Sequence, residues 1–290
     1  MAGFVVDVST GWVWGGALVW SLVAVACIYR FSLLRLPETS GSFPFSFKQF
    51  LVMGLALCSA TGLYFASFVV SGGLVNALQS SLSSMLPSYT PQEWTALSQI
   101  LGMTLGLASI IMVRMVLPND ALSTVVGSGT GIGKLLKGAA VGVLVYPVIL
   151  FVAWIVSAAV SVFTTEPKVP QLSLELFLQI PRSGAMFWGM VGVAVFLAPY
   201  VEEMLFRGFL QGFFNGLIHP SLSVLTTAAA FSAVHYSVLQ KGSNYEIVAG
   251  LFLFSVIASN LREREDSILA SIGYHAAYNI VTLAVLFWCT

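Results

Sequence analysis

Charged residues are scarce in this sequence. Only 8% of the 290 residues are Asp, Glu, Lys or Arg, whereas 58% are hydrophobic. Soluble domains carry roughly 25% charged residues, so a water-soluble fold of this chain would leave large apolar patches exposed. A lipid bilayer removes this difficulty because the exterior of a membrane protein must itself be apolar. The composition therefore predicts an integral membrane protein.

The sequence also lacks an excess of charge of either sign. The 12 Lys and Arg residues balance the 12 Asp and Glu residues, which leaves no basic face for nucleic acid. The three cysteines, Cys27, Cys58 and Cys289, are isolated and show no metal-ligand spacing. We expect them to serve as small apolar residues of membrane helices, and no pattern in the sequence predicts a cofactor.

Long apolar runs, by contrast, are abundant. A membrane-spanning helix needs about 17–25 mostly apolar residues. Eight segments approach this length: residues 11–29, 50–70, 97–116, 139–162, 185–217, 222–239, 247–261 and 268–288. The predicted fold is an all-α, polytopic membrane bundle of about eight transmembrane helices. A further short helix is expected over residues 172–180, lying at the membrane interface.

Basic residues beside the spans indicate the orientation of the chain in the membrane. Most of them belong to the turns that join odd spans to the next even span: Arg30, Arg35, Lys48, Arg114, Lys134, Lys137, Arg262 and Arg264. The turns on the other side hold only Lys168, Arg182 and Lys241. We therefore predict that the first group faces the cytoplasm and that both termini lie outside.

The fifth apolar segment contains three charged residues, Glu202, Glu203 and Arg207. Each charge at the middle of a bilayer costs about 2.5–3.5 kcal/mol on insertion scales, so these residues must pair or face a hydrated cavity. Glu203 and Arg207 are four residues apart and can form an ion pair on one helix face. Glu202 points about 100° away from Glu203. Pro199 removes a backbone hydrogen bond just before the three charges.

Two of the three histidines also fall in apolar segments. His235 belongs to the sixth segment, and His275 and Asn279 lie four residues apart in the eighth, so they share one helix face. His219 lies in a predicted loop and receives no catalytic role. Taken one at a time, each of these residues could simply form hydrogen bonds between helices. Such a contact typically stabilises a membrane protein by about 0.6 kcal/mol. Together, a carboxylate, two imidazoles and an amide are the parts of a hydrolase that activates water.

Three sequence patterns resemble the motifs of a known family. They are Glu202-Glu203-x-x-x-Arg207, Phe231-x-x-x-His235 and His275-x-x-x-Asn279. In this order, and on separate apolar segments, they are similar to the signature motifs of the Rce1-like CAAX endopeptidases. This family of intramembrane glutamate proteases is also called CPBP, for CAAX proteases and bacteriocin-processing enzymes. The likeness covers about residues 185–288.

The resemblance implies a role for each matching residue. It makes Glu202 the general base that activates water and His235 the residue that positions this water. It makes His275 and Asn279 the donors to the oxyanion of the tetrahedral intermediate. Glu203 and Arg207 would hold the first motif in place. Residues 1–184 would then supply N-terminal transmembrane helices and loops, and residues 185–290 the catalytic helices, within a single membrane domain.

The expected activity is hydrolysis of peptide bonds in membrane-associated or lipidated substrates, with the bilayer as the protein's surroundings. We expect a multi-pass protein of the bacterial inner membrane, with a cavity that opens to the lipid and the cytoplasm. The alternative function is a non-proteolytic membrane factor of the same family, with an immunity, scaffold or chaperone-like role. A transporter is a further option, because buried carboxylates and histidines also form proton relays.

Two other interpretations of the motifs remain open. Two His and one Glu could hold zinc, although the sequence contains no HExxH motif. The glycine-rich residues 127–134 resemble a phosphate-binding loop, but Ser128 and Leu135 occupy positions that the P-loop pattern gives to Gly and to Ser or Thr. We interpret this segment as a flexible cytoplasmic linker.

Overall fold

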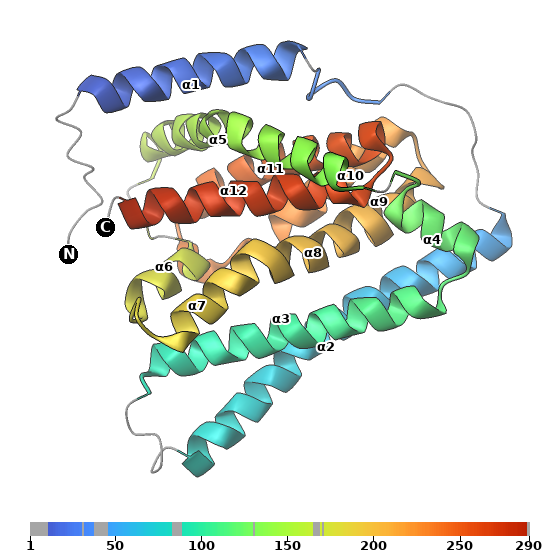
Figure 1. Ribbon diagram of the computed structural model, residues 1–290, viewed down its shortest axis with the longest axis horizontal. Coiled ribbons are helices and arrows are strands. Elements are labelled where there is room, and N and C mark those ends of the chain that lie inside the picture. Colours follow the sequence, from blue (N-terminus) through green and yellow to red (C-terminus); the bar gives the residue numbers. More distant parts are fainter. Residues whose placement is uncertain are drawn as a thin grey trace.

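A computed structural model of the chain describes residues 11–30, 32–37, 46–82, 89–129, 131–164, 169 and 171–288. These residues form an all-α bundle without a β-strand (Figure 1). The α-helices are α1 (Gly11–Arg30), α2 (Phe47–Leu82), α3 (Pro91–Val116), α4 (Asn119–Val126), α5 (Ile132–Ser161), α6 (Leu172–Gln179), α7 (Ala185–Gly192), α8 (Ala198–Glu203), α9 (Gln211–Asn215), α10 (Pro220–Ala233), α11 (Asn244–Glu265) and α12 (Ile268–Trp288). Two π-helical turns, η1 (Val193–Leu197) and η2 (Met204–Leu210), and the short 3₁₀ helix η3 (Val238–Gln240) complete the elements.

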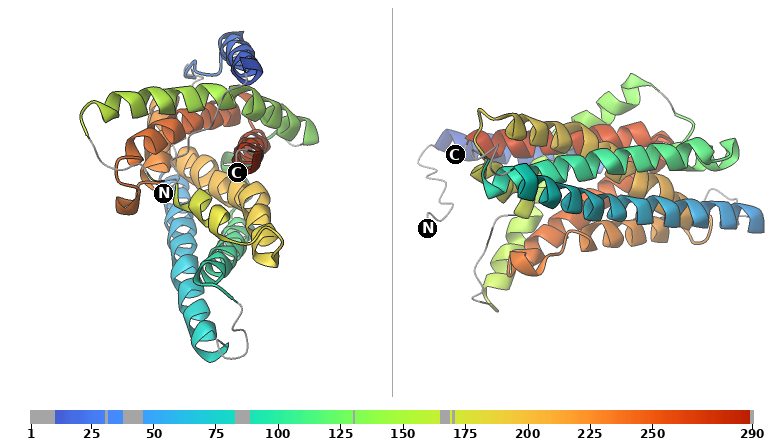
Figure 2. Two further views of the ribbon diagram at one scale, coloured as in Figure 1. Left: turned by 90° about the vertical axis from the view of Figure 1, so that its left-hand side faces the viewer. Right: turned by 90° about the horizontal axis from the view of Figure 1, so that it is seen from below.

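The long helices lie side by side in layers (Figures 1 and 2). α5 packs against α11 and α12, and α1 lies on the other side of α5. α2 and α3 pair with each other, and the segment from α7 to α9 lies between this pair and α12. The helices of the two halves of the sequence are therefore packed into one bundle, and the polar segment from α8 to η2 lies inside it.

The prediction of an all-α polytopic membrane bundle is confirmed, but the count of eight spans is not. Six helices in the described part of the chain are long and apolar enough to cross a membrane: Phe47–Ser81, Pro91–Val116, Ile132–Ser161, Ala185–Asn215, Asn244–Glu265 and Ile268–Trp288. The first expected span corresponds to the helix α1, for which side chains are described only in part. The short helix expected over residues 172–180 is present as α6.

The sixth expected span, residues 222–239, is wrong in extent. α10 ends at Ala233 and has 14 residues, which corresponds to about 21 Å at 1.5 Å per residue, less than the thickness of the hydrocarbon core. The chain then turns and forms a loop. Asn244 holds this loop, because its side-chain Oδ1 accepts from the N–H of Ser237 and its Nδ2 donates to the carbonyls of Ser237 and Lys241.

The segment that carries the charged motif is a continuous helix interrupted by two π-helical turns. Pro199 explains the first of them. The N–H of Ala198 bonds to the carbonyl of Val193, five residues earlier, and Pro199 has no N–H with which to continue this pattern. The second π turn begins directly after Glu203. Such turns are rare and frequently occur at functional sites.

α5 and α12 cross at very short distance because glycines face the crossing. A Cβ atom on Gly138 would lie 1.8 Å from the carbonyl oxygen of Ala270, and one on Gly142 would lie 2.4 Å from that of Tyr274. Small residues four positions apart allow the backbones of two membrane helices to approach in this way. Since His275 follows Tyr274, this crossing determines the position of a candidate catalytic residue.

We expect Gly138→Ala to lower the free energy of unfolding by about 1–3 kcal/mol, because the new methyl group collides with backbone that cannot yield. The matched control is Gly133→Ala in the same helix, where a Cβ atom meets nothing within 4 Å. There the gain in helix propensity should stabilise the protein by up to about 1 kcal/mol. Thermal denaturation in detergent measures both. Equal stability of the two variants would contradict the close packing of α5 on α12.

The described residues of the glycine-rich segment, 127–129 and 131–134, are anchored to the rest of the protein, contrary to the expectation of a flexible linker. The N–H of Gly129 donates to the carbonyl of Asp266 at 2.7 Å, and Lys134 forms an ion pair of 2.7 Å with Glu265. Gly127 has a φ of 76°, and a Cβ atom on it would lie 2.2 Å from the oxygen of Asp266. Gly127 and Gly129 thus serve close packing against the turn between α11 and α12.

Candidate active site

One cavity of about 860 Å³ brings together the four candidate catalytic residues, Glu202, His235, His275 and Asn279. Glu202 comes from α8, His275 and Asn279 from α12, and His235 from the turn after α10. Side chains from α2, α3, α6 and α11 complete the walls. The three sequence motifs therefore meet in space, as the resemblance implied.

The two adjacent glutamates have different environments. Glu203 is completely buried, whereas the side chain of Glu202 keeps 14% of its surface exposed and lines the cavity. The predicted ion pair between Glu203 and Arg207 is present, with 2.9 Å between Oε1 and Nη1. One carboxylate is thus neutralised inside the protein, and the other is available to water and to a bound molecule.

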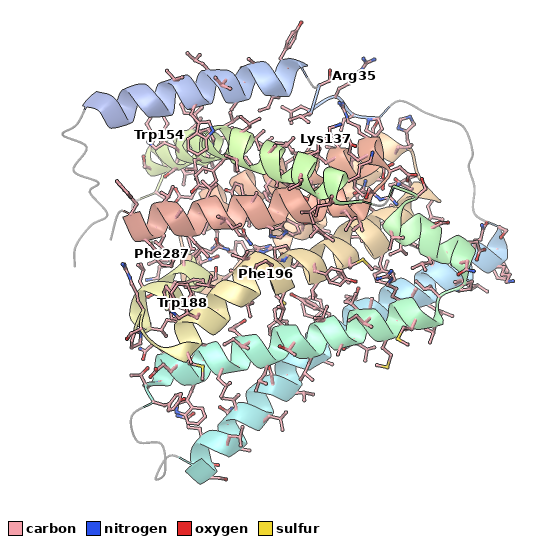
Figure 3. All side chains as sticks on the ribbon, viewed as in Figure 1. Arg35, Lys137, Trp154, Trp188, Phe196 and Phe287 are labelled. Carbon is pink, nitrogen blue, oxygen red and sulfur yellow. The ribbon has the colours of Figure 1, made fainter. Side chains whose placement is uncertain are left out.

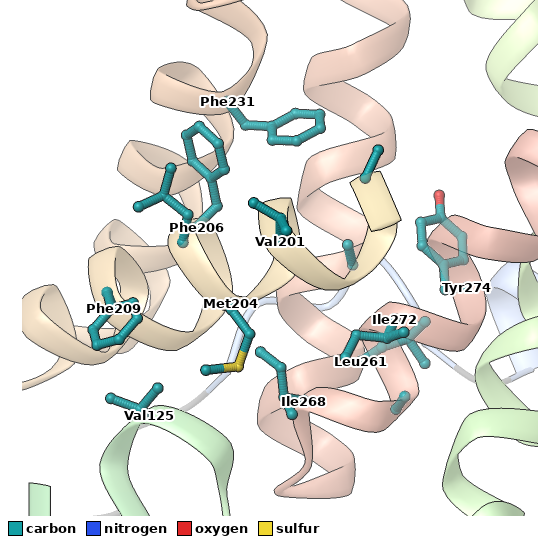
Figure 4. Close-up of a cluster of buried hydrophobic side chains, with 14 of the residues drawn as sticks. Val125, Val201, Met204, Phe206, Phe209, Phe231, Leu261, Ile268, Ile272 and Tyr274 are labelled. Carbon is teal, nitrogen blue, oxygen red and sulfur yellow. The ribbon is translucent and has the colours of Figure 1, made fainter. Parts of the chain in front are cut away.

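Arg207 is held on several sides although it is fully buried. Its Nη2 donates to the hydroxyl of Ser255 on α11 at 2.7 Å, and its guanidinium carbon lies 4.5 Å from the centre of the Phe231 ring. Hydrogen bonds and a cation–π contact together reduce the cost of burying the charge. The apolar side chains of Met204, Phe206 and others form the core of the bundle (Figure 4).

Glu203 also orients His275, which the sequence did not predict. Its Oε1 accepts from Nδ1 of His275 at 2.8 Å. A carboxylate only accepts hydrogen bonds, so the imidazole proton lies on Nδ1 and Nε2 faces the cavity. This Nε2 is 4.0 Å from Oε2 of Glu202. The distance exceeds a direct hydrogen bond but allows both groups to contact the same water or substrate atom.

His235 lies in a turn and not, as predicted, inside a membrane-spanning helix. α10 ends at Ala233, two residues before it. The Nδ1 of His235 is 2.8 Å from the carbonyl oxygen of Phe231. Because a carbonyl can only accept, Nδ1 carries the proton of this hydrogen bond and Nε2 keeps a free lone pair. His235 is therefore fixed in the tautomer that accepts a hydrogen bond from water.

Asn279 supplies a hydrogen bond that Pro199 cannot donate within the helix that contains Pro199. In the π-helical pattern of η1, the carbonyl of Ala194 would accept from residue 199, which is proline and has no N–H. The Nδ2 of Asn279 donates to this carbonyl at 2.8 Å. One amide proton is thus used to join α12 to η1, and the second proton remains for another acceptor.

A double-mutant cycle can test this account of Asn279. Asn279→Ala leaves the Ala194 carbonyl without its donor and is expected to cost about 1–3 kcal/mol of unfolding free energy. In the background of Pro199→Ala the same replacement should cost less, because residue 199 then supplies an N–H. Thermal unfolding of the four proteins in detergent gives the coupling. Additive effects would show that Asn279 and Pro199 act independently.

The sequence analysis did not identify Ser255 or the other polar residues of α11. A spacing of four residues separates the polar residues of α11, which are Ser255, Ser259 and Glu263. The same spacing separates the residues that they face, Arg207 and Gln211. Gln211 donates both to the carbonyl of Ser259 and to the carboxylate of Glu263. This matched spacing of polar residues in two apolar segments is the signal that would have found the contact.

The positions of the possible metal ligands bear on the hypothesis that two His and one Glu hold zinc. In the described part of the chain, no three His, Cys, Asp or Glu side chains lie close enough together to hold a metal ion. The imidazole of His275 directs one nitrogen to Glu203 and the other to Glu202, at unequal distances of 2.8 and 4.0 Å. The arrangement is that of a hydrogen-bonded acid–histidine pair.

The fold and the site define a polytopic membrane protein with a polar cavity among its helices. Comparison with protein families agrees with the motifs: residues 184–281 match the family described as type II CAAX prenyl endopeptidase Rce1-like. This third of the chain is similar to the Rce1-like family, and the resemblance seen in the three motifs is confirmed over these residues. Neither a curated protein nor a solved structure matched the chain.

Proposed function

We propose that the protein is an intramembrane endopeptidase in which Glu202 activates water to hydrolyse peptide bonds of membrane-associated substrates. The observation that carries this proposal is the convergence of Glu202, His235, His275 and Asn279 on one cavity, with the Glu203–Arg207 pair buried beside it. The Rce1-like domain supports the class of reaction. No metal takes part in the proposed steps.

In the first step the carboxylate of Glu202 removes a proton from a bound water molecule. The resulting hydroxide attacks the carbonyl carbon of the peptide, and the carbonyl oxygen takes the negative charge. The lone pair on Nε2 of His235 accepts the second hydrogen of the water and so directs its oxygen to the substrate. Protonated Glu202 then delivers its proton to the leaving amine as the C–N bond breaks.

His275 and Asn279 stabilise the oxyanion in this proposal. Nε2 of His275 faces the cavity, and it donates a hydrogen bond when the ring carries a second proton. The hydrogen bond from Nδ1 to Glu203 fixes the ring in the orientation that points Nε2 to this place. Asn279 contributes the amide proton that it does not use on Ala194. Preorganised donors of this kind are each worth about 10²–10³ in rate.

The proposal can be tested by comparing two sets of membranes, one with the wild-type protein and one with Glu202→Gln at matched expression. The measurement is the set of new peptide termini that form in each. Termini that appear only with wild type are expected, and their sequences identify the substrates. If no termini depend on Glu202 in the native membrane proteome, the proposed hydrolysis is wrong. A scaffold or immunity role that survives the replacement would then be the better account.

A further inference from the structure

We propose that substrates enter the site from the non-cytoplasmic side of the membrane, as extended peptide segments without charged side chains near the cleaved bond. This inference rests on the proposed peptidase function for the nature of the substrate. The side of entry rests on two independent features: the end of the bundle at which the cavity opens and the end at which the basic residues gather.

The cavity extends from the middle of the bundle to one end only. On α3, which runs towards Arg114, the cavity is lined by the first half, from Pro91 to Met103. On α12, which runs the opposite way, it is lined by the second half, from His275 to Leu283. α6 lies at this end and contributes to the wall (Figure 1). Glu202 and His275 are therefore at the closed, inner end of the cavity.

The exposed residues of the wall mark the entrance. Five residues that line the cavity are exposed. They are Thr95 and Gln99 on α3, Ser173 and Gln179 on α6, and Tyr236 after α10. By contrast, His275 at the inner end is only 5% exposed. These residues line a route from the surface to Glu202 between α3, α6 and the loop after α10.

The opposite end of the bundle is closed and basic. Beyond Arg207, the polar residues Gln211 and Asn215 bond to Glu263 and fill the space between η2, α9 and α11. The basic residues at this end include Arg35, Lys48, Arg114, Lys134, Lys137, Arg262 and Arg264. Arg35 and Lys137 lie towards this end in Figure 3, whereas Trp188 and Phe287 lie towards the other.

The distribution of basic residues assigns the two ends to the two sides of the membrane. Of the basic residues expected on the outer side, the structure describes Arg182 and Lys241, and Lys168 lies outside the described residues. Cytoplasmic loops carry the excess of Lys and Arg. The basic end is therefore cytoplasmic, and the cavity opens on the other side. This placement conflicts with the expectation of a cavity that opens to the cytoplasm.

The chemistry of the entrance indicates what passes through it. The chain has eight glutamines, and five of them line this cavity: Gln92, Gln99, Gln171, Gln179 and Gln240. The described wall contains no Lys or Arg, and Glu175 is its only carboxylate besides Glu202. Gln240 is 2% exposed, and its Oε1 has no hydrogen-bond partner among the described residues. Amide side chains both donate and accept, as an extended peptide backbone requires.

Cysteine labelling tests the side of entry without any need for activity. In a background in which Cys27, Cys58 and Cys289 are replaced by Ser, Thr95→Cys places a thiol at the entrance and Ile132→Cys places one at the basic end. Both positions are exposed, Ile132 by 71%. A membrane-impermeant maleimide should label Thr95→Cys in spheroplasts and Ile132→Cys only in inverted vesicles. The reverse pattern, or labelling of Thr95→Cys from the cytoplasmic side, would overturn the proposal.

The Glu202-dependent peptide termini test the nature of the substrate. They should map to non-cytoplasmic segments of membrane proteins and lack charged residues next to the cleaved bond. Treating Thr95→Cys spheroplasts with the impermeant maleimide should reduce these termini at least tenfold, and the same treatment of Ile132→Cys should not. Glu202-dependent termini in cytoplasmic segments would refute the side of entry while leaving the peptidase function intact. Absence of all such termini would instead refute the peptidase function, and the labelling pattern would still report where the cavity opens.

Discussion

Glu202→Gln is expected to lower the rate of peptide hydrolysis by about 10²–10⁴-fold, the usual contribution of a general base. Glutamine has the size of glutamate and can still hydrogen-bond to water, but it cannot remove a proton. The side chain lines the cavity and takes no part in the buried ion pair. The folded state should therefore keep its stability within about 0.5 kcal/mol, as is usual for substitutions away from packed contacts.

Two measurements on purified protein distinguish this result from misfolding. Thermal denaturation in detergent should give the same midpoint for wild type and Glu202→Gln. Asp120→Asn is a matched control, since it neutralises an exposed carboxylate at the start of α4, at the opposite end of the bundle from the cavity entrance. This control should keep full activity. Normal hydrolysis by folded Glu202→Gln would remove Glu202 from the mechanism.

Arg207→Met is expected to lower the free energy of unfolding by about 3–5 kcal/mol, because it leaves the carboxylate of Glu203 buried without its countercharge. Both residues are fully buried, so bulk water does not screen the charge that remains. The double variant Glu203→Leu/Arg207→Met removes both charges together. It should be less destabilised than Arg207→Met, since replacing a whole buried pair by apolar residues is often neutral.

Activity separates the structural role of this pair from its effect on the site. Glu203 holds His275 through the 2.8 Å hydrogen bond to Nδ1, and the double variant lacks this bond. We therefore expect the double variant to recover stability but not hydrolysis. Glu203→Asp with Arg207 intact is the comparison, because it keeps both charges. A fully active double variant would show that Glu203 does not position His275, and equal destabilisation of double and single variants would show that the charges are not coupled.

Much of the fold follows from properties that act locally along the chain. The scarcity of charge and the length of the apolar runs predicted the helical membrane bundle because a bilayer requires every backbone group to be paired within a helix. The spacing of Glu203 and Arg207 predicted their ion pair because four residues return to the same helix face. The three motifs predicted the residues that meet at the cavity because each motif lies within one or two helical turns.

Contacts between distant segments could not be predicted in the same way. The hydrogen bond from His275 to Glu203 joins residues 72 positions apart, and the partner of Asn279 became clear only when the break at Pro199 was seen beside it. The premature end of α10, which moves His235 into a turn, depends on the loop that Asn244 holds. Apolar composition alone cannot reveal such an end, because the residues after Ala233 remain apolar enough to continue a helix.

The sequence by itself thus determined the class of protein, most of the helical segments and the three motifs that meet at the cavity. Only the tertiary structure decided which glutamate is buried, which nitrogen of each histidine faces the cavity and at which end the cavity opens. The physical reason is that hydropathy and helical spacing depend on neighbours in the chain. Burial, tautomers and access depend on the atoms that other helices bring to within a few ångströms.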